Sequence, residues 1–288
     1  MDIRKAVIPA AGFGTRFLPV TRTVPKVMLP VLDEPAIQFS VREAAQAGIE
    51  HIVFVISRGQ EATNDYFQPV PALERALEER GNTELLNRMR EISSMIETSF
   101  VYQDEQLGLG HAVLMARDQI GSEPFAVFLP DDIIFSDAPV IGEMMRVFAE
   151  HGSSVIAVKQ VPDAAIPSLG VIDPERLSER VYRIKGMVEK PRLEDAPSNL
   201  AIIGRYVLTP EVFDAIESGR PGAIGEIQLT DAIEAVRAEQ GAYAYRITDD
   251  HFDVGTPAGM LKASVYAALR RDDMEGEMRE WLAAALAG

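Results

Sequence analysis

Short runs of apolar residues alternate with longer amphipathic stretches along this 288-residue chain. The segments RKAVIPA, HIVFVIS, TSFVYQ and FAVFLP are rich in β-branched residues, as in strands buried on both faces, and they occupy 4–10, 51–57, 98–103 and 125–130. Helical patterns lie between them, at 35–48, 71–95, 109–120 and 139–151. This order predicts an α/β fold with a Rossmann-like, mostly parallel, doubly wound sheet and helices on both faces.

The alternation continues in the second half of the chain. Strands are expected near 153–161, 180–188, 200–208 and 242–248, and helices near 210–218, 225–240 and 256–271. The last segment, DDMEGEMREWLAAALAG, predicts a C-terminal helix that carries the only tryptophan, Trp281, and packs against the body or against another subunit. Because no linker-like composition divides the chain, we expect a single domain over 1–288 with helical additions.

The charge balance limits the possible partners. The chain has 28 basic and 44 acidic side chains and a formal charge of −16. A field of this sign repels nucleic-acid phosphates and anionic membrane surfaces, so neither is an expected partner. An anionic substrate must therefore be met by a local group of Lys, Arg and backbone N–H groups.

Cysteine content and hydropathy exclude several classes of protein. The chain has 0 cysteines, which excludes disulfides, a thiolate nucleophile and a zinc–cysteine site. No apolar run approaches the roughly 20 residues that span a bilayer. The N-terminal apolar stretch is too short for a signal peptide. We therefore expect a cytoplasmic enzyme or binding protein.

The first strand is followed by AAGFGTRFLPVTRTVPKVMLP, residues 10–30. A dinucleotide fingerprint would need a third glycine at position 17, which is Phe17, and a Walker A sequence is absent. Gly12 and Gly14 allow backbone N–H groups to approach a phosphate, while Arg16 and Lys26 supply cations. Although a glycine-rich turn alone is most often only a turn, the combination favours a triphosphate site.

A glutamine closes the third strand-like segment. Gln103 is followed by GLGHAV, which begins with Gly108. A side-chain amide can pair with uracil or thymine, because both present an N–H flanked by carbonyl groups. A single glutamine at a strand end is nevertheless more often structural.

Acidic residues follow the fourth strand-like segment. Asp131 and Asp132 come directly after Pro130, and Asp253 lies between a predicted strand and a predicted helix. Hard oxygen ligands suit Mg²⁺, which typically takes one or two carboxylates together with substrate phosphates. Paired loop acids are often only solvated, so this site requires Asp131 and Asp253 to converge.

Two motifs in the second half carry further polar groups. In GMVEKP, Glu189 can accept hydrogen bonds from sugar hydroxyls and Lys190 can pair with a phosphate. In GEIQLTDAI, Glu226 is expected to open a helix, where a carboxylate also favours the helix dipole.

The motifs together resemble those of the bacterial UTP–glucose-1-phosphate uridylyltransferases, in the sugar nucleotidyltransferase family. The resemblance covers roughly residues 3 to 270 and consists of AAGFGTRFLP, PKVMLP, GLGHAV, LPDD, VEKP, GEIQLTDAI and FDVGTP, in that order. It implies a nucleotide-binding half at about 1–135, a sugar-binding half at about 136–260 and C-terminal helices at about 256–288.

On the nucleotide side, the resemblance implies that the triphosphate is wrapped by Gly12, Gly14, Thr15 and Arg16. Lys26 would contact phosphate at the reacting centre. The nucleoside would lie against Ala10 and Ala11, and the base would be addressed by Gln103 and Gly108. Mg²⁺, the expected cofactor, would be held by Asp131 and Asp253.

On the sugar side, the resemblance implies that Glu189 binds glucose hydroxyls and Lys190 binds the sugar phosphate. Gly170 matches a sugar-side glycine, and Gly204–Arg205 is expected at another turn of the sugar pocket. Arg16, Lys26 and Lys190 would be the catalytic cations. Members of this family are commonly dimers or tetramers, so a homodimer or homotetramer is expected.

Two positions depart from the family pattern. Val27 stands where an acid is usual, and Leu169 stands where a tyrosine is usual. Neither change removes a phosphate or metal ligand, but both bear on substrate preference and packing.

The expected reaction joins UTP and glucose 1-phosphate to give UDP-glucose and pyrophosphate. dTTP is an alternative substrate, because Gln103 does not separate uracil from thymine. A non-catalytic sugar-nucleotide sensor is the alternative from another class, and a nicotinamide-dependent oxidoreductase is disfavoured by Phe17.

Overall fold

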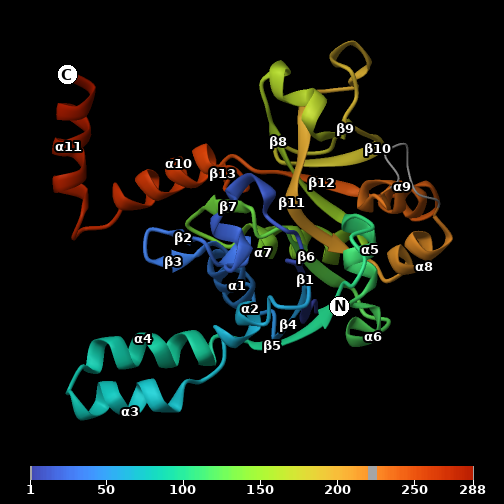
Figure 1. The fold of residues 1–288 in the computed structure, drawn as a ribbon. Helices are drawn as coiled ribbons and strands as arrows, with labels where there is room; N and C mark the ends of the chain where they lie inside the picture. The colour runs from blue at the N-terminus through green and yellow to red at the C-terminus, as the bar shows by residue number, and fades with distance from the viewer. Residues whose placement is uncertain (1, 220–225, 288) are drawn as a thin grey trace.

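The computed structural model of the chain describes residues 2–219 and 226–287. Its described part contains one large sheet of nine strands, in the order β5-β4-β1-β6-β11-β8-β12-β10-β9 (Figure 1). The first four strands in this order are parallel and comprise β5 (Glu97–Tyr102), β4 (His51–Ile56), β1 (Lys5–Pro9) and β6 (Phe125–Phe128).

The second half of the sheet changes direction. β11 (Leu200–Leu208) runs antiparallel to both β6 and β8 (Val155–Gln160). β12 (Tyr243–Arg246) is parallel to β8, whereas β10 (Val181–Glu189) pairs antiparallel with β12 and with β9 (Gly170–Arg176). The predicted α/β class is confirmed, and the large sheet is mixed rather than mostly parallel, because most pairings of its second half are antiparallel.

Two hydrophobic cores cover the two faces of the sheet. One face packs against α1 (Ala36–Gln46) and α7 (Val140–His151). The other packs against α5 (Leu109–Leu114), α8 (Glu211–Ser218) and α9 (Leu229–Gln240). Successive residues of β1 alternate between the cores, since Ala6 and Ile8 belong to the first and Val7 to the second. The doubly wound arrangement therefore follows from continuous apolar strands.

Val27, the departure from the family pattern, is one of the residues in the first core. Its side chain is 3% exposed in a short 3-10 turn, Lys26–Met28. An aliphatic side chain fills this position without the desolvation cost that an ionised side chain would carry. Valine at this position is thus explained by packing.

Several predicted elements differ in detail. The segment 71–95 forms two helices, α3 (Pro71–Glu79) and α4 (Thr83–Ser94), because Gly81 adopts a left-handed φ of 67° and Asn82 caps the second helix. The segment 109–120 divides into α5 and α6 (Arg117–Ile120). Glu226 does not open a helix, since α9 begins at Leu229; the predicted start at 225 lies outside the described residues.

The hydrophobic pattern does not predict four short strands. They form two small antiparallel pairs, β2 (Pro30–Val31) with β3 (Glu34–Pro35), and β7 (Asp132–Phe135) with β13 (Asp250–Asp253). The second pair places Asp253 opposite Asp132. It thereby brings the two acidic motifs of the sequence to one place.

A four-residue helix, α2 (Ala62–Asp65), follows β4.

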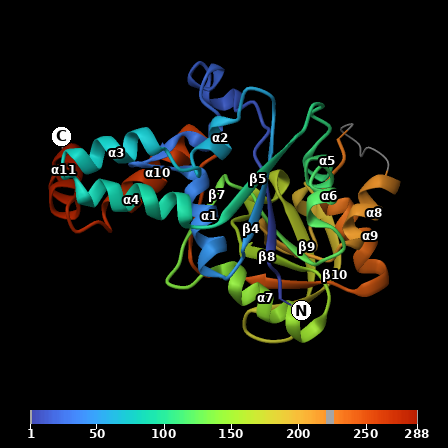
Figure 2. The same ribbon diagram turned by 90° about the horizontal axis from the view of Figure 1, so that it is seen from below.

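Two helical arms project from the same side of the sheet. One arm is the α3–α4 hairpin, and the other consists of α10 (Pro257–Ala268) and α11 (Glu275–Ala287) (Figures 1 and 2). All residues of α3 and α11 retain some exposure to solvent within this chain. In the part of the chain that the structure describes, no helix is long and apolar enough to cross a membrane.

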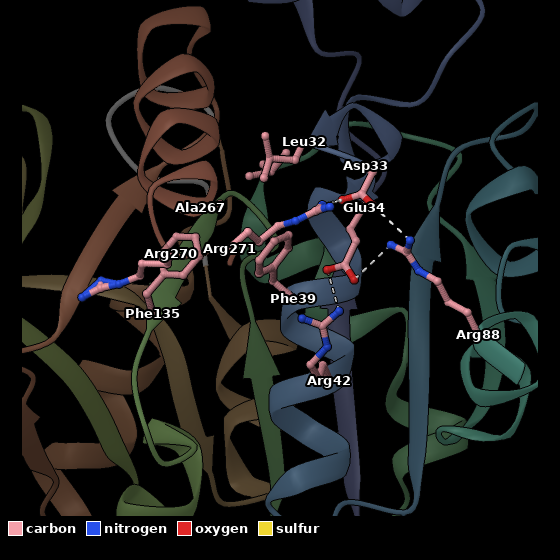
Figure 3. A pocket seen from close by; sticks show the side chains of 11 residues that line it. Leu32, Asp33, Glu34, Phe39, Arg42, Arg88, Phe135, Ala267, Arg270 and Arg271 are labelled. Atoms are coloured by element: carbon pink, nitrogen blue, oxygen red, sulfur yellow. Dashed lines mark hydrogen bonds and ion pairs between the residues drawn. The ribbon is translucent and has the colours of Figure 1, made fainter. Parts of the chain in front are cut away.

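Ion pairs connect both arms to the turn between β2 and β3 (Figure 3). Asp33 accepts hydrogen bonds from Arg88 of α4 at 3.0 Å and from Arg271, beyond α10, at 2.8 Å. Glu34 accepts one from Arg42 of α1 at 2.5 Å. Burial acts to raise the pKa of Asp33, but the hydrogen bond and charge of Arg88 and the charge of Arg271 outweigh it and lower that pKa. Arg88 and Arg271 therefore tie the arms to the β2–β3 turn, and Arg42 ties this turn to α1.

Candidate active site

The loop after β1 is anchored at its start and open at its tip. Ala10 and Ala11 are buried, and the carbonyl of Ala11 accepts hydrogen bonds from Ser57 at 2.9 Å and Gln106 at 3.2 Å. A Cβ at Gly12 would have no heavy atom within 4 Å. Thr15 and Arg16 follow in an exposed 3-10 turn, Thr15–Phe17. The backbone around Gly12 thus offers open space to a ligand.

Gly14 allows the two ends of this loop to meet. Its φ is +61°, and a Cβ there would lie 2.8 Å from Lys26 Cβ and 2.9 Å from Thr21 Cγ2. The Thr21 hydroxyl also donates to the Gly14 carbonyl at 2.9 Å. A side chain at position 14 would push Lys26 away, so glycine is required by both conformation and close packing.

Lys26 joins the loop to the end of β6. Its ammonium group forms an ion pair with Asp131, and both side chains are partly exposed. The structure therefore brings together a cation and a carboxylate that lie 105 positions apart in the sequence.

Asp131 and Asp253 also converge. A Cβ at Gly255 would lie 2.8 Å from Asp131 Oδ2 and 2.9 Å from Asp253 Oδ1. The N–H of Gly255 donates to Asp253 Oδ1 at 2.8 Å, and the Val254 N–H donates to the Asp131 carbonyl at 2.7 Å. Among the described residues, no group of three or more His, Asp or Glu side chains could hold a metal. Two carboxylates are nevertheless enough for Mg²⁺ when substrate phosphates complete its coordination.

Gln103 is buried directly after the end of β5. It is 3% exposed, and its amide nitrogen donates to the Gly108 carbonyl at 3.3 Å and lies 3.0 Å from His111 Nδ1. Gly108 has a φ of +107°, and a Cβ there would lie 2.8 Å from the Ile227 carbonyl oxygen. These contacts orient the Gln103 amide and press the GLGHAV motif against GEIQLTDAI.

The sugar-side residues gather at the end of β10. A Cβ at Gly170 would lie 2.7 Å from Glu189 Oε2, and that oxygen accepts a hydrogen bond from Thr230 at 3.1 Å. Lys190 has a φ of +48° and its ammonium lies 3.5 Å from Glu189 Oε1. The Lys190 N–H donates to the Leu169 carbonyl at 3.1 Å, so the leucine that departs from the family pattern contributes its backbone here.

Gly204 and Arg205 do not form a turn, because both lie inside β11. The Arg205 side chain is 1% exposed and points into the core, where its Nε donates to Glu43 Oε2 at 3.0 Å and its Nη1 donates to the Leu129 carbonyl at 3.1 Å. Its guanidinium also stacks over Phe128. The predicted turn is wrong, and the buried ion pair leaves the Arg205 side chain directed away from a sugar.

Four residues of this region were not assigned by sequence reasoning. Asp132 accepts a hydrogen bond from the Gly204 N–H at 3.1 Å and contacts His251 at 2.5 Å. Burial raises the pKa of Tyr206, and the charges of Asp132 and Glu189 raise it further. Thr230 belongs to the GEIQLTDAI motif, which was the available indication for it. Asp132 was visible in LPDD, whereas nothing in the pattern pointed to Tyr206 or His251.

Comparison with known proteins defines the class of this one. Residues 5–268 match the family described as nucleotidyl transferase, and the chain belongs to this family. It is 47% identical over 281 residues to a UTP–glucose-1-phosphate uridylyltransferase of Staphylococcus haemolyticus (strain JCSC1435), covering 98% of each chain.

Solved structures agree with this assignment. The fold is similar to that of a UDP-glucose pyrophosphorylase complexed with UDP-glucose, with a TM-score of 0.85 and 41% identity over 94% of this chain and 100% of that chain. It is also similar to a UTP-bound UGPase from Acinetobacter baumannii, with a TM-score of 0.90 and 36% identity over 98% of this chain and 99% of that one. The resemblance seen in the sequence motifs is therefore confirmed.

Proposed function

We propose that this nucleotidyltransferase converts UTP and glucose 1-phosphate to UDP-glucose and pyrophosphate. The observation that carries the proposal is the ion pair between Lys26 and Asp131, which joins the glycine-rich loop to the acidic end of β6. Asp253 lies beside this pair, across Gly255. The names of the relatives, UTP–glucose-1-phosphate uridylyltransferase and UDP-glucose pyrophosphorylase, support the choice of substrates.

The reaction is an in-line displacement. A phosphate oxygen of glucose 1-phosphate attacks the α-phosphorus of UTP, and the bond from that phosphorus to the departing pyrophosphate breaks. No covalent enzyme intermediate is needed, since the nucleophile is already ionised. One anion must approach another, so the work of the protein is positioning and charge neutralisation. Arg16 and Lys26 stabilise the pyrophosphate, and Lys190 directs the attacking phosphate.

Mg²⁺ fits the donor set that Asp131 and Asp253 provide. Their oxygens flank Gly255, whose missing side chain leaves room between them. When bound, Mg²⁺ supplies positive charge to phosphate oxygens. Lys26, already paired with Asp131, connects this position to the triphosphate loop.

We assign the remaining residues the binding roles that the family resemblance implies. The nucleoside rests on Ala10 and Ala11, its phosphates lie against Gly12, Gly14 and Thr15, and Gln103 with Gly108 faces the base. The missing side chains of Gly170 and Gly204 admit the carboxylates of Glu189 and Asp132, respectively, beside the proposed sugar position. We accordingly propose a single domain with a nucleotide half at about 1–135, a sugar half at about 136–260 and C-terminal helices at about 256–288.

We further propose that the enzyme is a cytoplasmic homodimer or homotetramer. All residues of α11 retain some exposure within the chain, and Trp281 and Leu286 are 60% and 86% exposed. A second subunit gives this helix a surface to pack against.

Product analysis tests the proposed function. The purified full-length chain is incubated with UTP, glucose 1-phosphate and Mg²⁺, and UDP-glucose and pyrophosphate are measured separately. Equimolar formation of both products is expected. A protein that binds UDP-glucose but catalyses no pyrophosphate exchange would instead be a sugar-nucleotide sensor.

A further inference from the structure

His251 connects two short strands beside the acidic site. It lies on β13, which pairs with β7, and its Nε2 atom is 2.5 Å from Asp132 Oδ1. The two side chains are only 15% and 17% exposed. A partly buried histidine that donates to a carboxylate holds that carboxylate in one orientation. The contact is not part of the Lys26–Asp131–Asp253 group, because it uses the neighbouring acid.

Asp132 has a second anchor on the central sheet. Its Oδ2 accepts the Gly204 N–H at 3.1 Å, and a Cβ at Gly204 would lie 2.4 Å from the same oxygen. The Asp132 carboxylate is therefore held between β13 and β11. A carboxylate has about four lone-pair sites, and these two contacts leave others free.

Asp132 lies near the residues that are proposed to bind the sugar. Tyr206 lies two residues beyond Gly204 on β11 and senses the negative charges of both Asp132 and Glu189. Glu189 in turn contacts Thr230 and the Gly170 position. β11 also reaches Gly170, since a Cβ there would lie 3.2 Å from Ile202 Cδ1, so the strand that anchors Asp132 at Gly204 also contacts the residues proposed to bind the sugar.

We propose that His251 is a positioning residue for the sugar-phosphate substrate: it fixes the Asp132 carboxylate against Gly204 and so maintains the sugar side of the pocket. This inference rests on the proposed function. It assigns His251 no contact with the reacting phosphates. Loss of the His251 N–H leaves Asp132 with the Gly204 anchor alone, and the binding of glucose 1-phosphate weakens while that of UTP does not.

The test compares three variants by steady-state kinetics with each substrate varied in turn. His251→Leu removes the donor at similar volume, and His251→Gln keeps an N–H group that can reach Asp132. His51→Leu is the matched control. His51 begins β4, and its Nε2 makes a similar contact of 2.8 Å with Ser99.

We expect His251→Leu to raise the KM for glucose 1-phosphate about tenfold or more, the effect of losing one hydrogen bond to a charged group. The KM for UTP should stay within about twofold of the wild-type value. His251→Gln should recover most of the loss, and His51→Leu should alter neither KM. Equal changes in both KM values with a lower Tm, or no recovery by glutamine, would show a merely structural role and overturn the inference. If the wild type makes UDP-glucose but His251→Leu is unaffected, this inference fails while the proposed function stands.

Discussion

Three glycines decide which charged groups of the site can meet. Gly14 admits Lys26, Gly204 admits the Asp132 carboxylate, and Gly255 lies between the carboxylates of Asp131 and Asp253. In each case a Cβ would approach a neighbouring heavy atom to less than 3.0 Å, closer than packed side chains allow. The chemistry of the site therefore depends on small residues as much as on charged ones.

Removing one charge from the reacting centre should stop turnover without unfolding the protein. Asp131→Asn removes the negative charge that pairs with Lys26 and changes one of the two proposed Mg²⁺ ligands, and Lys190→Ala removes the cation that is proposed to direct the attacking phosphate. Each should lower the rate of pyrophosphate release by about 10²–10³. Rate and thermal unfolding are measured on the same samples.

The matched control for the lysine is Lys185→Ala. Lys185 lies on β10, the strand that ends directly before Lys190, is 53% exposed against 49% for Lys190, and pairs with Asp173 on β9. It should retain wild-type turnover. Near-full activity in Asp131→Asn or Lys190→Ala would contradict the role of that residue.

Gly255→Ala should weaken the use of Mg²⁺. The added methyl group would press on both carboxylates, and groups that orient metal ligands typically change metal affinity or activity by about 10–100-fold. The Mg²⁺ concentration for half-maximal activity is the measurement. Gly186→Ala is the control, since a Cβ at Gly186 would have no heavy atom within 4 Å. An unchanged Mg²⁺ requirement in Gly255→Ala would place the metal elsewhere.

At the scale of elements, Glu43 fastens three parts of the fold together. The carboxylate belongs to α1, its Oε2 accepts from Arg205 of β11, and its Oε1 accepts from the Ile141 N–H at 3.0 Å, in the first turn of α7. The pair is nearly inaccessible to water, with exposures of 1% for Arg205 and 10% for Glu43. This buried ion pair therefore has a structural role.

Arg205→Met should destabilise the fold and leave substrate affinity unchanged. Removing one partner of a buried ion pair typically costs about 3–5 kcal/mol, because the other charge stays buried without compensation. Urea unfolding measures the loss, and KM values are determined well below the transition. A stable variant with a raised KM for glucose 1-phosphate would instead make Arg205 a substrate ligand.

The sequence indicates elements more reliably than their pairing. Apolar runs marked the strands of the large sheet except β9, but the same runs suit parallel and antiparallel partners, so the reversal at β11 was not encoded in the pattern. β7 and β13 are too short for periodicity to reveal them, although they bring Asp132 opposite Asp253. Arg205 was misplaced for a different reason, since the family resemblance implied a turn at Gly204–Arg205 although both residues fall inside the strand predicted at 200–208.

At the scale of the whole molecule, the two arms have more apolar surface than their own chain covers. Leu73 of α3, Leu85 of α4 and Trp281 of α11 are 43%, 46% and 60% exposed. A helix of 13 residues with little tertiary packing is marginal in water. This is consistent with the proposed association of subunits.

Trp281→Glu should convert the oligomer to a smaller species. A charge at the centre of the exposed apolar face of α11 would have to be buried at the subunit contact, which is unfavourable without a partner. Light scattering coupled to size-exclusion chromatography measures the mass. Glu280→Gln, at the neighbouring exposed position, is the control and should remain associated. A monomeric wild type would contradict the proposed oligomer.

The central claim is the choice of substrates, and one assay tests it most directly. Pyrophosphate release is measured with purified full-length protein across four nucleoside triphosphates, each with glucose 1-phosphate and with other sugar 1-phosphates. We predict the highest kcat/KM for UTP with glucose 1-phosphate. A higher kcat/KM for dTTP, or release that does not depend on glucose 1-phosphate, would contradict the account.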